Sequence, residues 1–535
     1  MNRIVNQTAE NIDTLVCDVL VVGGGINGVG IARDAAGRGL SVVLCEQDDL
    51  AAHTSSSSSK LIHGGLRYLE HYEFGLVRKA LIEREVLLRA APHIMWPMRF
   101  VMPHDKGQRP AWLIRAGMFL YDHLARRELL PGSRAINLRK HAAGAPLKSN
   151  FVRGFVYSDG WVDDARLVVL NAMDAAERGA RILTHTRCES IARQGATWQA
   201  SLRDRQGQNI KVTARCVVNA AGPWVAQFLE GAAQRSSSKS VRLVKGSHIV
   251  VKRLSQHDHA YIFQNPDGRI VFAIPYEKEF TLIGTTDVEY HGDTSKVSIS
   301  AEEIDYLCTL SNRYFEKAIT PADVVWSYAG VRPLLEDAAA DASAVTRDYQ
   351  LDFDVEGAPL LSVFGGKITT FRKLAEEAVD LIAPALANTQ VSWTANACLP
   401  GGDIFDARPD NRSVREFDRF ISNLQRDHAW LPAPLLARYA RAYGSRTQQL
   451  LAGCKTMENM GEEILSGLFA VEVDYLMRQE WASCAADILW RRSKLGLHLP
   501  AGSDVILDNW IAARSSGKSR GHSVAEETDQ AVVSK

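Results

Sequence analysis

The stretch Cys17-Asp-Val-Leu-Val-Val-Gly-Gly-Gly-Ile-Asn-Gly28, with Glu46 downstream of it, decides the fold of this chain. Val19–Val22 is a continuous apolar run, as expected of a strand buried on both faces of a parallel sheet. The glycines that follow form the pattern G-x-G-x-x-G, and Val29–Arg38 predicts a helix. A second predicted strand, Ser41–Cys45, ends at Glu46. Strand, glycines, helix, strand and terminal acid, in register within about 30 residues, predict a dinucleotide-binding βαβ unit.

Each part of this pattern has a mechanical reason. Gly23 makes the tight turn, Gly25 lets the backbone approach a pyrophosphate, and Gly28 lets the helix pack closely on the strand. The helix N-terminus then offers free N–H groups to the phosphates. Glu46 is placed to accept both hydroxyls of an adenosine ribose, and an acid at this position argues against a 2′-phosphate. The nucleotide is therefore FAD or NAD.

Two later glycine turns favour FAD. Cys216-Val-Val-Asn-Ala-Ala-Gly-Pro-Trp224 and Leu361-Ser-Val-Phe-Gly-Gly-Lys-Ile-Thr-Thr370 both follow distant predicted strands. Flavoproteins of this fold commonly enclose an extended FAD with three such separate segments. The residues predicted to bind the cofactor are Gly23, Gly25, Gly28, Glu46, Ser57, Ser58, Ser59, Ala221, Gly222, Gly365, Gly366 and Thr369.

The serines come from Ala51-Ala-His-Thr-Ser-Ser-Ser-Ser-Ser-Lys60, which resembles a low-complexity linker. Its position directly after the ribose acid favours a second interpretation. Its hydroxyls and backbone N–H groups are then expected to line the pyrophosphate and the ribityl chain.

Size and composition are those of a globular protein with two to four domains. The chain has 535 residues, of which 46% are hydrophobic and 23% charged. Lys plus Arg equals Asp plus Glu at 62 each, so no bulk charge favours nucleic acid as a partner. No run of 18 apolar residues predicts a membrane span, and the first ten residues do not resemble a secretory signal. The eight cysteines form no C-x-x-C, so we expect reduced thiols, a cytoplasmic location, and neither a metal nor a disulfide framework.

Periodicity and turn residues extend this interpretation along the chain. The predicted helices are Phe74–Ala91 and Ala165–Arg178, and the predicted strands are Arg181–Leu183, Thr197–Leu202, Ile210–Ala214, Ile270–Pro275 and Phe280–Gly284. From about Pro400 to Trp510 the composition is helical.

The residues with the clearest chemical potential lie in Ser59-Lys-Leu-Ile-His-Gly-Gly-Leu-Arg-Tyr-Leu-Glu70. Two glycines flanked by His63, Arg67 and Tyr68 predict a short loop with acid–base and anion-binding groups. A flavin dehydrogenase needs a base for a hydroxyl proton while a hydride leaves the same carbon, and histidine suits that role near neutral pH. The alternative is a histidine that only satisfies the core or caps an element.

Two more cations lie at the ends of apolar runs. Arg332 is in Tyr328-Ala-Gly-Val-Arg-Pro333, and Lys367 lies between Gly366 and Ile368. A charge in an apolar setting is costly without a partner. One such cation could belong to a structural ion pair, whereas three separate ones indicate an anionic ligand.

Several long motifs resemble the FAD-dependent glycerol-3-phosphate dehydrogenase family, most of all the bacterial aerobic, respiratory type. The resemblance covers roughly residues 16–513. The motifs are Ser57–Glu73, Glu83–Leu88, Trp161–Arg166, Lys245–Val251, Gly284–Asp287, Phe364–Thr370 and Asp487–Arg492.

This resemblance implies oxidation of sn-glycerol 3-phosphate to dihydroxyacetone phosphate, with electrons passed to a membrane quinone. It places His63, Arg67, Tyr68, Arg332 and Lys367 around the substrate. We assign His63 as the catalytic base and Arg332 as its rival, which could instead orient the hydroxyls. Asp287 is either a helper or a turn residue.

The implied fold is α/β, or α+β overall: a Rossmann-like FAD-binding domain of the glutathione-reductase and amino-acid-oxidase type, a substrate domain on an antiparallel sheet, and a helical C-terminal cap. The FAD-binding domain is expected at 16–92, 160–240 and 326–390, the substrate domain at 93–159 and 241–325, and the cap at 400–513. Residues 1–15 and 514–535 are expected to be flexible.

A quinone acceptor requires contact with a membrane. Arg109–Arg127, with aromatic and aliphatic residues between terminal arginines, predicts a peripheral contact with the cytoplasmic face of the inner membrane, or else an internal helix. The family resemblance also implies a homodimer. The alternatives are a glycerol-3-phosphate oxidase using oxygen, an amino-acid oxidase of the same fold, and a flavin-binding scaffold without activity.

Overall fold

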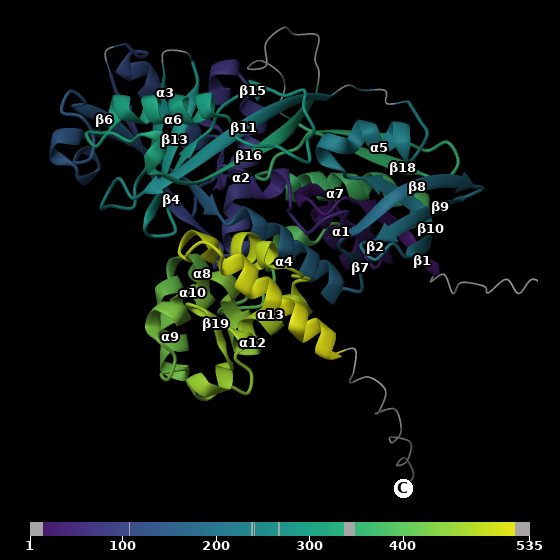
Figure 1. The fold of residues 1–535 in the computed structure, drawn as a ribbon. Coiled ribbons are helices and arrows are strands. Elements are labelled where there is room, and N and C mark those ends of the chain that lie inside the picture. Colours follow the sequence, from purple (N-terminus) through teal and green to yellow (C-terminus); the bar gives the residue numbers. More distant parts are fainter. Residues whose placement is uncertain are drawn as a thin grey trace, which may run out of the picture. The chain divides into compact units, whose positions relative to one another are not determined.

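In the computed structural model of the protein, the described residues are 14–105, 107–236, 239, 241–265, 268–335 and 348–518. The chain forms two compact units, Met1–Gln449 and Leu450–Lys535, and each is described by itself. The larger unit contains two sheets with their covering helices (Figure 1).

The first sheet has a parallel centre built on the glycine-rich stretch. Its strands lie in the order β17 (Gln350–Asp354), β18 (Leu360–Phe364), β10 (Asn209–Asn219), β1 (Thr14–Val22), β2 (Val42–Cys45) and β7 (Arg181–Leu183), and β9 (Thr197–Asp204) and β8 (Thr186–Gln194) extend it from β10. The strand β1 pairs in parallel with both β10 and β2. Val19, Leu20 and Val21 are fully buried, so the prediction of a central parallel strand is confirmed.

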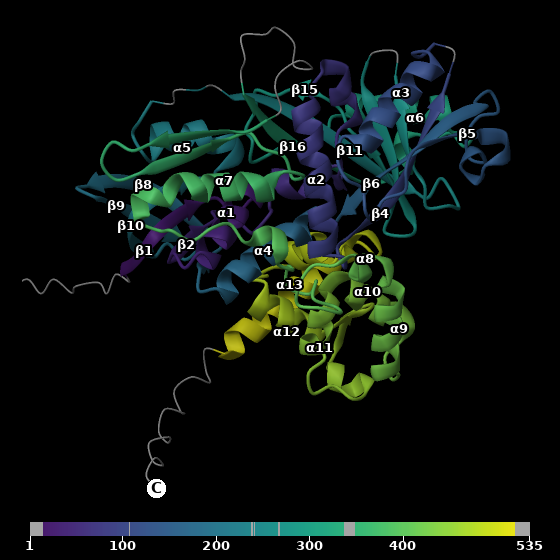
Figure 2. The same ribbon diagram turned by 180° about the vertical axis from the view of Figure 1, so that it is seen from behind.

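Two helices pack against a third beside this sheet. Their bounds are α1 (Ile26–Gly37), α4 (Asp164–Glu177) and α7 (Phe371–Ile382), and α1 contacts both of the others (Figure 2). The helix α1 begins at Ile26, three residues before the predicted start. Gly25 is its N-cap with extended backbone, so the helix starts directly after the turn and Gly28 falls inside it.

The second sheet is almost wholly antiparallel. Its order is β15 (Val288–Glu289), β11 (Val241–Lys252), β14 (Phe280–Gly284), β13 (Ile270–Tyr276), β12 (Ala260–Gln264), β4 (Met95–His104), β6 (Arg153–Val162) and β3 (Leu61–Ile62), with β16 (Val324–Leu335) on β11 and β5 (Arg134–Asn137) on β6. The pairing of β12 with β4 is parallel.

Side chains alternate between the two faces of this sheet. Val101 and Val156 point into a core that also contains Leu307 of α6 (Ala301–Tyr314). Their neighbours Phe100 and Tyr157 line a cavity on the opposite face. A period of two thus gives the sheet one face for the core and one for the site.

The predicted domain boundaries stay predictions, although two strands, β3 and β16, lie in the second sheet and not with the predicted FAD-binding domain. The boundary at 326 placed nearly all of β16 in the FAD-binding domain, but β16 pairs with β11 along its length in the second sheet. The cause is long-range pairing, which an apolar run alone does not reveal.

The remaining elements are mostly helical, as predicted. They are α2 (Phe74–Ala90), α3 (Ala111–His123), α5 (Val225–Gly231), α8 (Asn411–Arg415), α9 (Phe417–Asp427), α10 (Ala433–Tyr443), α11 (Thr447–Leu450), α12 (Ala470–Gln479) and α13 (Ser503–Lys518), with a short hairpin of β19 (Glu463–Leu465) and β20 (Leu468–Phe469). The helix α13 continues past the predicted start of the tail at 514, whereas 1–13 and 519–535 lie outside the described residues.

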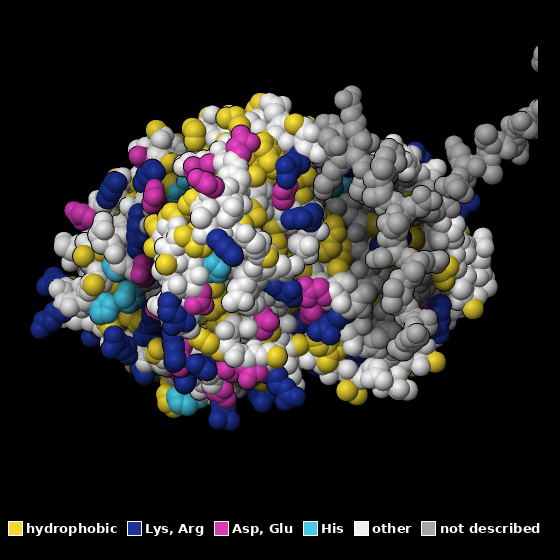
Figure 3. Space-filling model, turned by 90° about the horizontal axis from the view of Figure 1, so that it is seen from below, with side chains coloured by type: hydrophobic (Ala, Val, Ile, Leu, Met, Phe, Trp, Pro, Cys, Tyr) yellow, Lys and Arg dark blue, Asp and Glu magenta, His cyan; other side chains and the backbone are white. Residues whose placement is uncertain are grey.

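Surface charge is mixed where it can be seen. Figure 3 shows basic and acidic side chains interspersed on the face that it draws. Within the described chain, no helix combines the length and apolar character needed to cross a bilayer.

Candidate active site

A first cavity lies where the glycine turns of β1, β10 and β18 meet. Of the residues predicted to bind the cofactor, those lining it are Gly23, Gly25, Glu46, Ala221, Gly222, Gly365 and Gly366. The three sequence segments thus come together, as a site for an extended dinucleotide requires.

Glu46 is held rigidly at one end of this cavity. Its Oε2 accepts the Gly24 N–H at 2.6 Å, and its Oε1 accepts the Asp48 N–H at 2.9 Å. Burial raises the pKa of Glu46, and the two N–H donors act in the opposite direction. Each carboxylate oxygen keeps a lone pair with which to accept a ribose hydroxyl.

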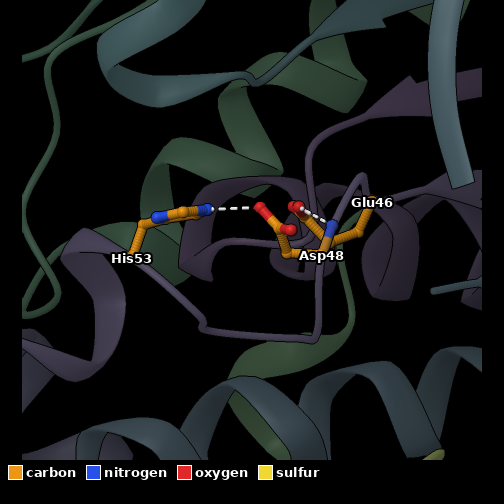
Figure 4. Close-up of side chains that lie close together, drawn as sticks. All are labelled: Glu46, Asp48 and His53. Atoms are coloured by element: carbon orange, nitrogen blue, oxygen red, sulfur yellow. Dashed lines mark hydrogen bonds and ion pairs between the residues drawn. The ribbon is translucent and has the colours of Figure 1, made fainter. Parts of the chain in front are cut away.

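The loop after Glu46 is fixed by a second contact. His53 Nε2 and Asp48 Oδ2 lie 2.7 Å apart, so the side chains of Glu46, Asp48 and His53 form one compact group (Figure 4). The His53 ring also packs edge-on against Trp224, with ring centroids 4.7 Å apart.

The three glycines of the motif have different structural roles. Gly23 has φ +114°, and a Cβ there would lie 2.5 Å from the Ala220 carbonyl oxygen. A Cβ on Gly28 would lie 1.9 Å from the Gly23 carbonyl oxygen. A Cβ on Gly25 would meet only Ser55 Oγ, at 3.2 Å. Gly23 and Gly28 are therefore required by the turn itself, whereas Gly25 keeps open the space in front of α1.

The predicted serines anchor their own segment. Ser58 Oγ donates to the buried Asp164 at 2.7 Å, and Ser57 Oγ donates to the His53 carbonyl oxygen at 3.2 Å. Ser59 Oγ lies 2.9 Å from His248 Nε2. The buried Lys60 also pairs with Asp164, at 2.7 Å. The segment is thus an ordered wall of the site, which argues against the linker interpretation.

A second cavity continues from the first. Ile26, Thr54, Ser55, Pro333, Gly365 and Gly366 line both. The five residues predicted to surround the substrate all line the second cavity: His63, Arg67, Tyr68, Arg332 and Lys367. Ser57, Ser58, Ser59 and Thr369 also line it, whereas Gly28 lines neither.

The side chain of Arg332 has a partner within the protein. It forms a short ion pair with Asp287, and its Nη2 donates to the Thr286 carbonyl oxygen at 3.2 Å. A Cβ on Gly246 would lie 3.0 Å from the same Nη2, so a glycine makes room for the guanidinium. The inference that three separate cations indicate an anionic ligand is therefore corrected for Arg332, which belongs to a structural ion pair. Asp287 is its counter-charge.

The other two cations, Lys367 and Arg67, line the same cavity. Lys367 Nζ lies over the Tyr68 ring, 4.0 Å from its centroid. Arg67 has no ion pair among the described residues. The wall of this cavity therefore combines a neutral Arg–Asp pair with two further cations that can meet an anion.

His63 lines the same cavity as the cations and contacts its apolar wall. Its backbone N–H donates to Thr369 Oγ1 at 3.4 Å, and its ring packs edge-on against Phe272 with centroids 6.4 Å apart. Its location in the cavity agrees with a role as a base, and the role itself remains a prediction.

Sequence reasoning missed His248 and Thr285, which line the same cavity. The His248 ring stacks on Tyr328 with centroids 4.8 Å apart. Burial, with the nearby charges of Lys60 and Arg332, lowers the pKa of His248 to about 3, so this imidazole is neutral at pH 7. The signal in the sequence was a histidine within the apolar run that follows Lys245-Gly-Ser.

Comparison with known proteins extends this picture. A family model described as FAD dependent oxidoreductase matches residues 18–372, and one described as the C-terminal domain of alpha-glycerophosphate oxidase matches residues 392–511. A glycerol-3-phosphate dehydrogenase of Pseudomonas aeruginosa is 53% identical over 95% of this chain and 97% of its own length. The aerobic glycerol-3-phosphate dehydrogenase of Escherichia coli is 49% identical over 92% and 97%.

Two further proteins are similar to this chain. A D-erythritol 1-phosphate dehydrogenase of Brucella abortus is 50% identical over 92% of this chain and 97% of its own. The crystal structure of a glycerol-3-phosphate dehydrogenase from Bacillus halodurans, complexed with FAD, is 29% identical and superposes with a TM-score of 0.74 over 94% of this chain and 91% of that one. The predicted fold and cofactor are thus confirmed. The chain belongs to the FAD-dependent glycerol-3-phosphate dehydrogenase family, and its cofactor is FAD.

Proposed function

We propose that this enzyme oxidises sn-glycerol 3-phosphate to dihydroxyacetone phosphate at the second cavity. The observation that carries the proposal is the meeting of His63, Arg67, Arg332 and Lys367 in one cavity that continues into the FAD site. A dianionic phosphate needs at least two cations, and a secondary alcohol needs a base. Both requirements are met by residues from separate parts of the chain.

The residues act in distinct ways in this proposal. Arg67, Arg332 and Lys367 bind the phosphate and orient the carbon chain, and Tyr68 keeps Lys367 in place through its ring. His63 takes the proton of the C2 hydroxyl at an imidazole nitrogen. FAD, when bound, supplies the acceptor for the hydride that leaves C2. The apolar wall around Phe272 keeps water from the reacting carbon.

A longer polyol phosphate is the competing substrate. The relative that acts on D-erythritol 1-phosphate is as similar to this chain as the one from Escherichia coli. A four-carbon substrate would direct an extra hydroxyl into the cavity, whose wall at Phe100, Ile262 and Phe272 is apolar. Burying a hydroxyl there without a partner is unfavourable, so we propose the three-carbon substrate.

Replacing Arg332 tests the proposed phosphate contact. A charge-assisted contact to phosphate contributes roughly 1.5–3 kcal/mol, so Arg332→Ala should weaken glycerol 3-phosphate binding by about one to two decades. Binding of uncharged glycerol should change little, because glycerol has no phosphate to lose. Both affinities follow from the substrate dependence of anaerobic flavin reduction.

Asp287→Asn is the matched control for Arg332→Ala. It leaves the Arg332 guanidinium charge to the phosphate alone, and we expect glycerol 3-phosphate to bind at least as tightly as in the wild type. Equal losses for glycerol and glycerol 3-phosphate in Arg332→Ala would remove Arg332 from the phosphate site and leave Arg67 and Lys367.

We propose that α3 contacts the membrane from which a quinone takes the electrons. Its exposed face carries large apolar side chains: Trp112 is 72% exposed, Leu113 41%, Phe119 57% and Leu120 38%. Met118 and Tyr121 on its other face are buried. An amphipathic helix with basic residues at its ends is suited to the interface of an anionic bilayer. This supports a peripheral contact with a membrane, and we propose the cytoplasmic face of the inner membrane as the location.

Two leucines of α3 allow a controlled test. Leu113→Ser with Leu120→Ser should lower binding to phosphatidylglycerol vesicles by at least about tenfold, because a buried leucine side chain contributes roughly 1.5–3 kcal/mol. Leu381→Ser is the control, since Leu381 on α7 is 40% exposed and outside α3. Cosedimentation measures binding. Equal binding of both variants and the wild type would contradict the proposed surface.

The remaining parts of the proposal rest on the family. A quinone as acceptor, a homodimer, and the discontinuous domain boundaries all follow the family resemblance. An oxidase would instead form hydrogen peroxide with oxygen in the absence of quinone, so measuring peroxide distinguishes the two.

A further inference from the structure

The loop that carries His63 is attached to a buried polar group behind the cavity. The N–H of Gly64 donates to Tyr121 Oη at 2.9 Å, and Asp159 Oδ1 lies 3.4 Å from the same nitrogen. A Cβ on Gly64 would lie 2.6 Å from Tyr121 Oη and 2.5 Å from Leu81. A glycine is therefore needed for the backbone to come this close.

The partners of this amide are themselves fixed. Tyr121 Oη lies 2.8 Å from Asp159 Oδ1 and donates to this carboxylate, which pairs with Arg84 Nη1 at 2.5 Å. Arg84 also donates to the Ser158 carbonyl oxygen at 3.1 Å. All three residues are at least 98% buried. A buried network in which the charges are paired holds one geometry.

The direction of the hydrogen bonds follows from these charges. Burial raises the pKa of Tyr121 far above its usual value, and the Asp159 charge acts in the same direction, so the phenol keeps its proton. That proton is donated to Asp159, and a lone pair of Oη is left to accept the Gly64 N–H. The acceptor therefore has a fixed orientation.

We propose that Tyr121, held by Asp159 and Arg84, is a positioning residue that aims His63 at the substrate carbon, and this rests on the proposed function. The amide after His63 is fixed by Tyr121, and the amide of His63 itself is fixed by Thr369 Oγ1. With both amides held, the Cα–Cβ bond of His63 has a defined direction. Side chains that set the angle of a base affect the rate more than the affinity for substrate.

The test is Tyr121→Phe in the FAD-loaded enzyme. The ring stays, so its packing against Tyr157 and Arg84 is kept. The substitution removes the hydroxyl, which accepts the Gly64 N–H and donates to Asp159. We expect the rate of anaerobic flavin reduction by saturating glycerol 3-phosphate to fall by about tenfold at every pH. Substrate affinity, FAD content and the apparent pKa of the rate profile should not change, because the base is still His63.

Tyr276→Phe is the control. Tyr276 is a buried tyrosine of β13, and its hydroxyl finds no hydrogen-bond partner in the described part of the chain, so its removal should leave the rate unchanged. Asp159→Asn keeps an oxygen that can accept from Tyr121, and it should reduce the rate less than Tyr121→Phe. If Tyr121→Phe does not fold, Asp159→Asn alone tests the proposal. In that case, losses of affinity and FAD content as large as the loss of rate would overturn the proposal.

Two results for Tyr121→Phe would also overturn it. One is a wild-type rate, and the other is a parallel loss of rate, affinity and FAD content, which indicates a purely structural role. A larger loss of rate in Asp159→Asn than in Tyr121→Phe would assign the effect to the charge instead. The wild-type reaction separates the two proposals. If glycerol 3-phosphate does not reduce the flavin of the wild type, the proposed function is contradicted, whereas the role of Tyr121 is not.

Discussion

His63→Asn should slow anaerobic flavin reduction by glycerol 3-phosphate by about two to four decades, the usual contribution of a general base. Asparagine has a similar shape and can donate and accept hydrogen bonds, but it does not take up a proton near neutral pH. FAD content and substrate affinity should therefore be retained. Stopped-flow absorbance of the flavin, with substrate varied, measures the rate and the affinity separately.

His248→Asn is the informative comparison, because His248 is the other imidazole in the cavity. Its pKa of about 3 makes it a weak base, so its replacement should cost less in rate than that of His63. A larger loss in His248→Asn would transfer the role of base to His248. An unchanged rate in both His63→Asn and His248→Asn would mean that neither imidazole is the base.

Gly25→Val should give a folded protein with little bound FAD, and thus almost no activity. Gly25 has φ −78°, which any residue adopts, and a Cβ there meets only Ser55 Oγ at 3.2 Å. The valine methyl groups would extend into the space in front of α1, where the pyrophosphate binds to helix N–H groups. Flavin absorbance of the purified protein relative to total protein measures the occupancy.

Gly75→Val on α2 is the control for this substitution, since a Cβ there meets nothing within 4 Å. It should keep its full yellow absorbance. Full flavin content in Gly25→Val would mean that this loop does not hold the pyrophosphate. Gly23 and Gly28 are less informative positions, because a side chain at either one collides with the backbone of the turn.

The FAD site could be predicted from the sequence because the residues that form it lie close together in the chain. Gly23, Gly25 and Glu46 lie within one βαβ unit, where strand, turn and helix fix their relative positions. The convergence of Arg332 and Lys367 with His63 was foreseen from the family resemblance, since these residues come from separate segments.

The pairings inside the site could not be foreseen. Arg332 and Asp287 are 45 positions apart, Gly64 and Tyr121 are 57 apart, and Ser59 and His248 are 189 apart. Such pairs depend on which strands become neighbours in the second sheet and where α3 packs. No local pattern in the sequence records these choices.

The proposed function is tested most directly by anaerobic mixing of the purified, FAD-loaded enzyme with sn-glycerol 3-phosphate, with glycerol and D-erythritol 1-phosphate as parallel samples. We expect rapid bleaching of the flavin by glycerol 3-phosphate, slower bleaching by the four-carbon phosphate, and little by glycerol. A flavin that stays oxidised with glycerol 3-phosphate, or bleaches faster with D-erythritol 1-phosphate, would contradict the proposed function.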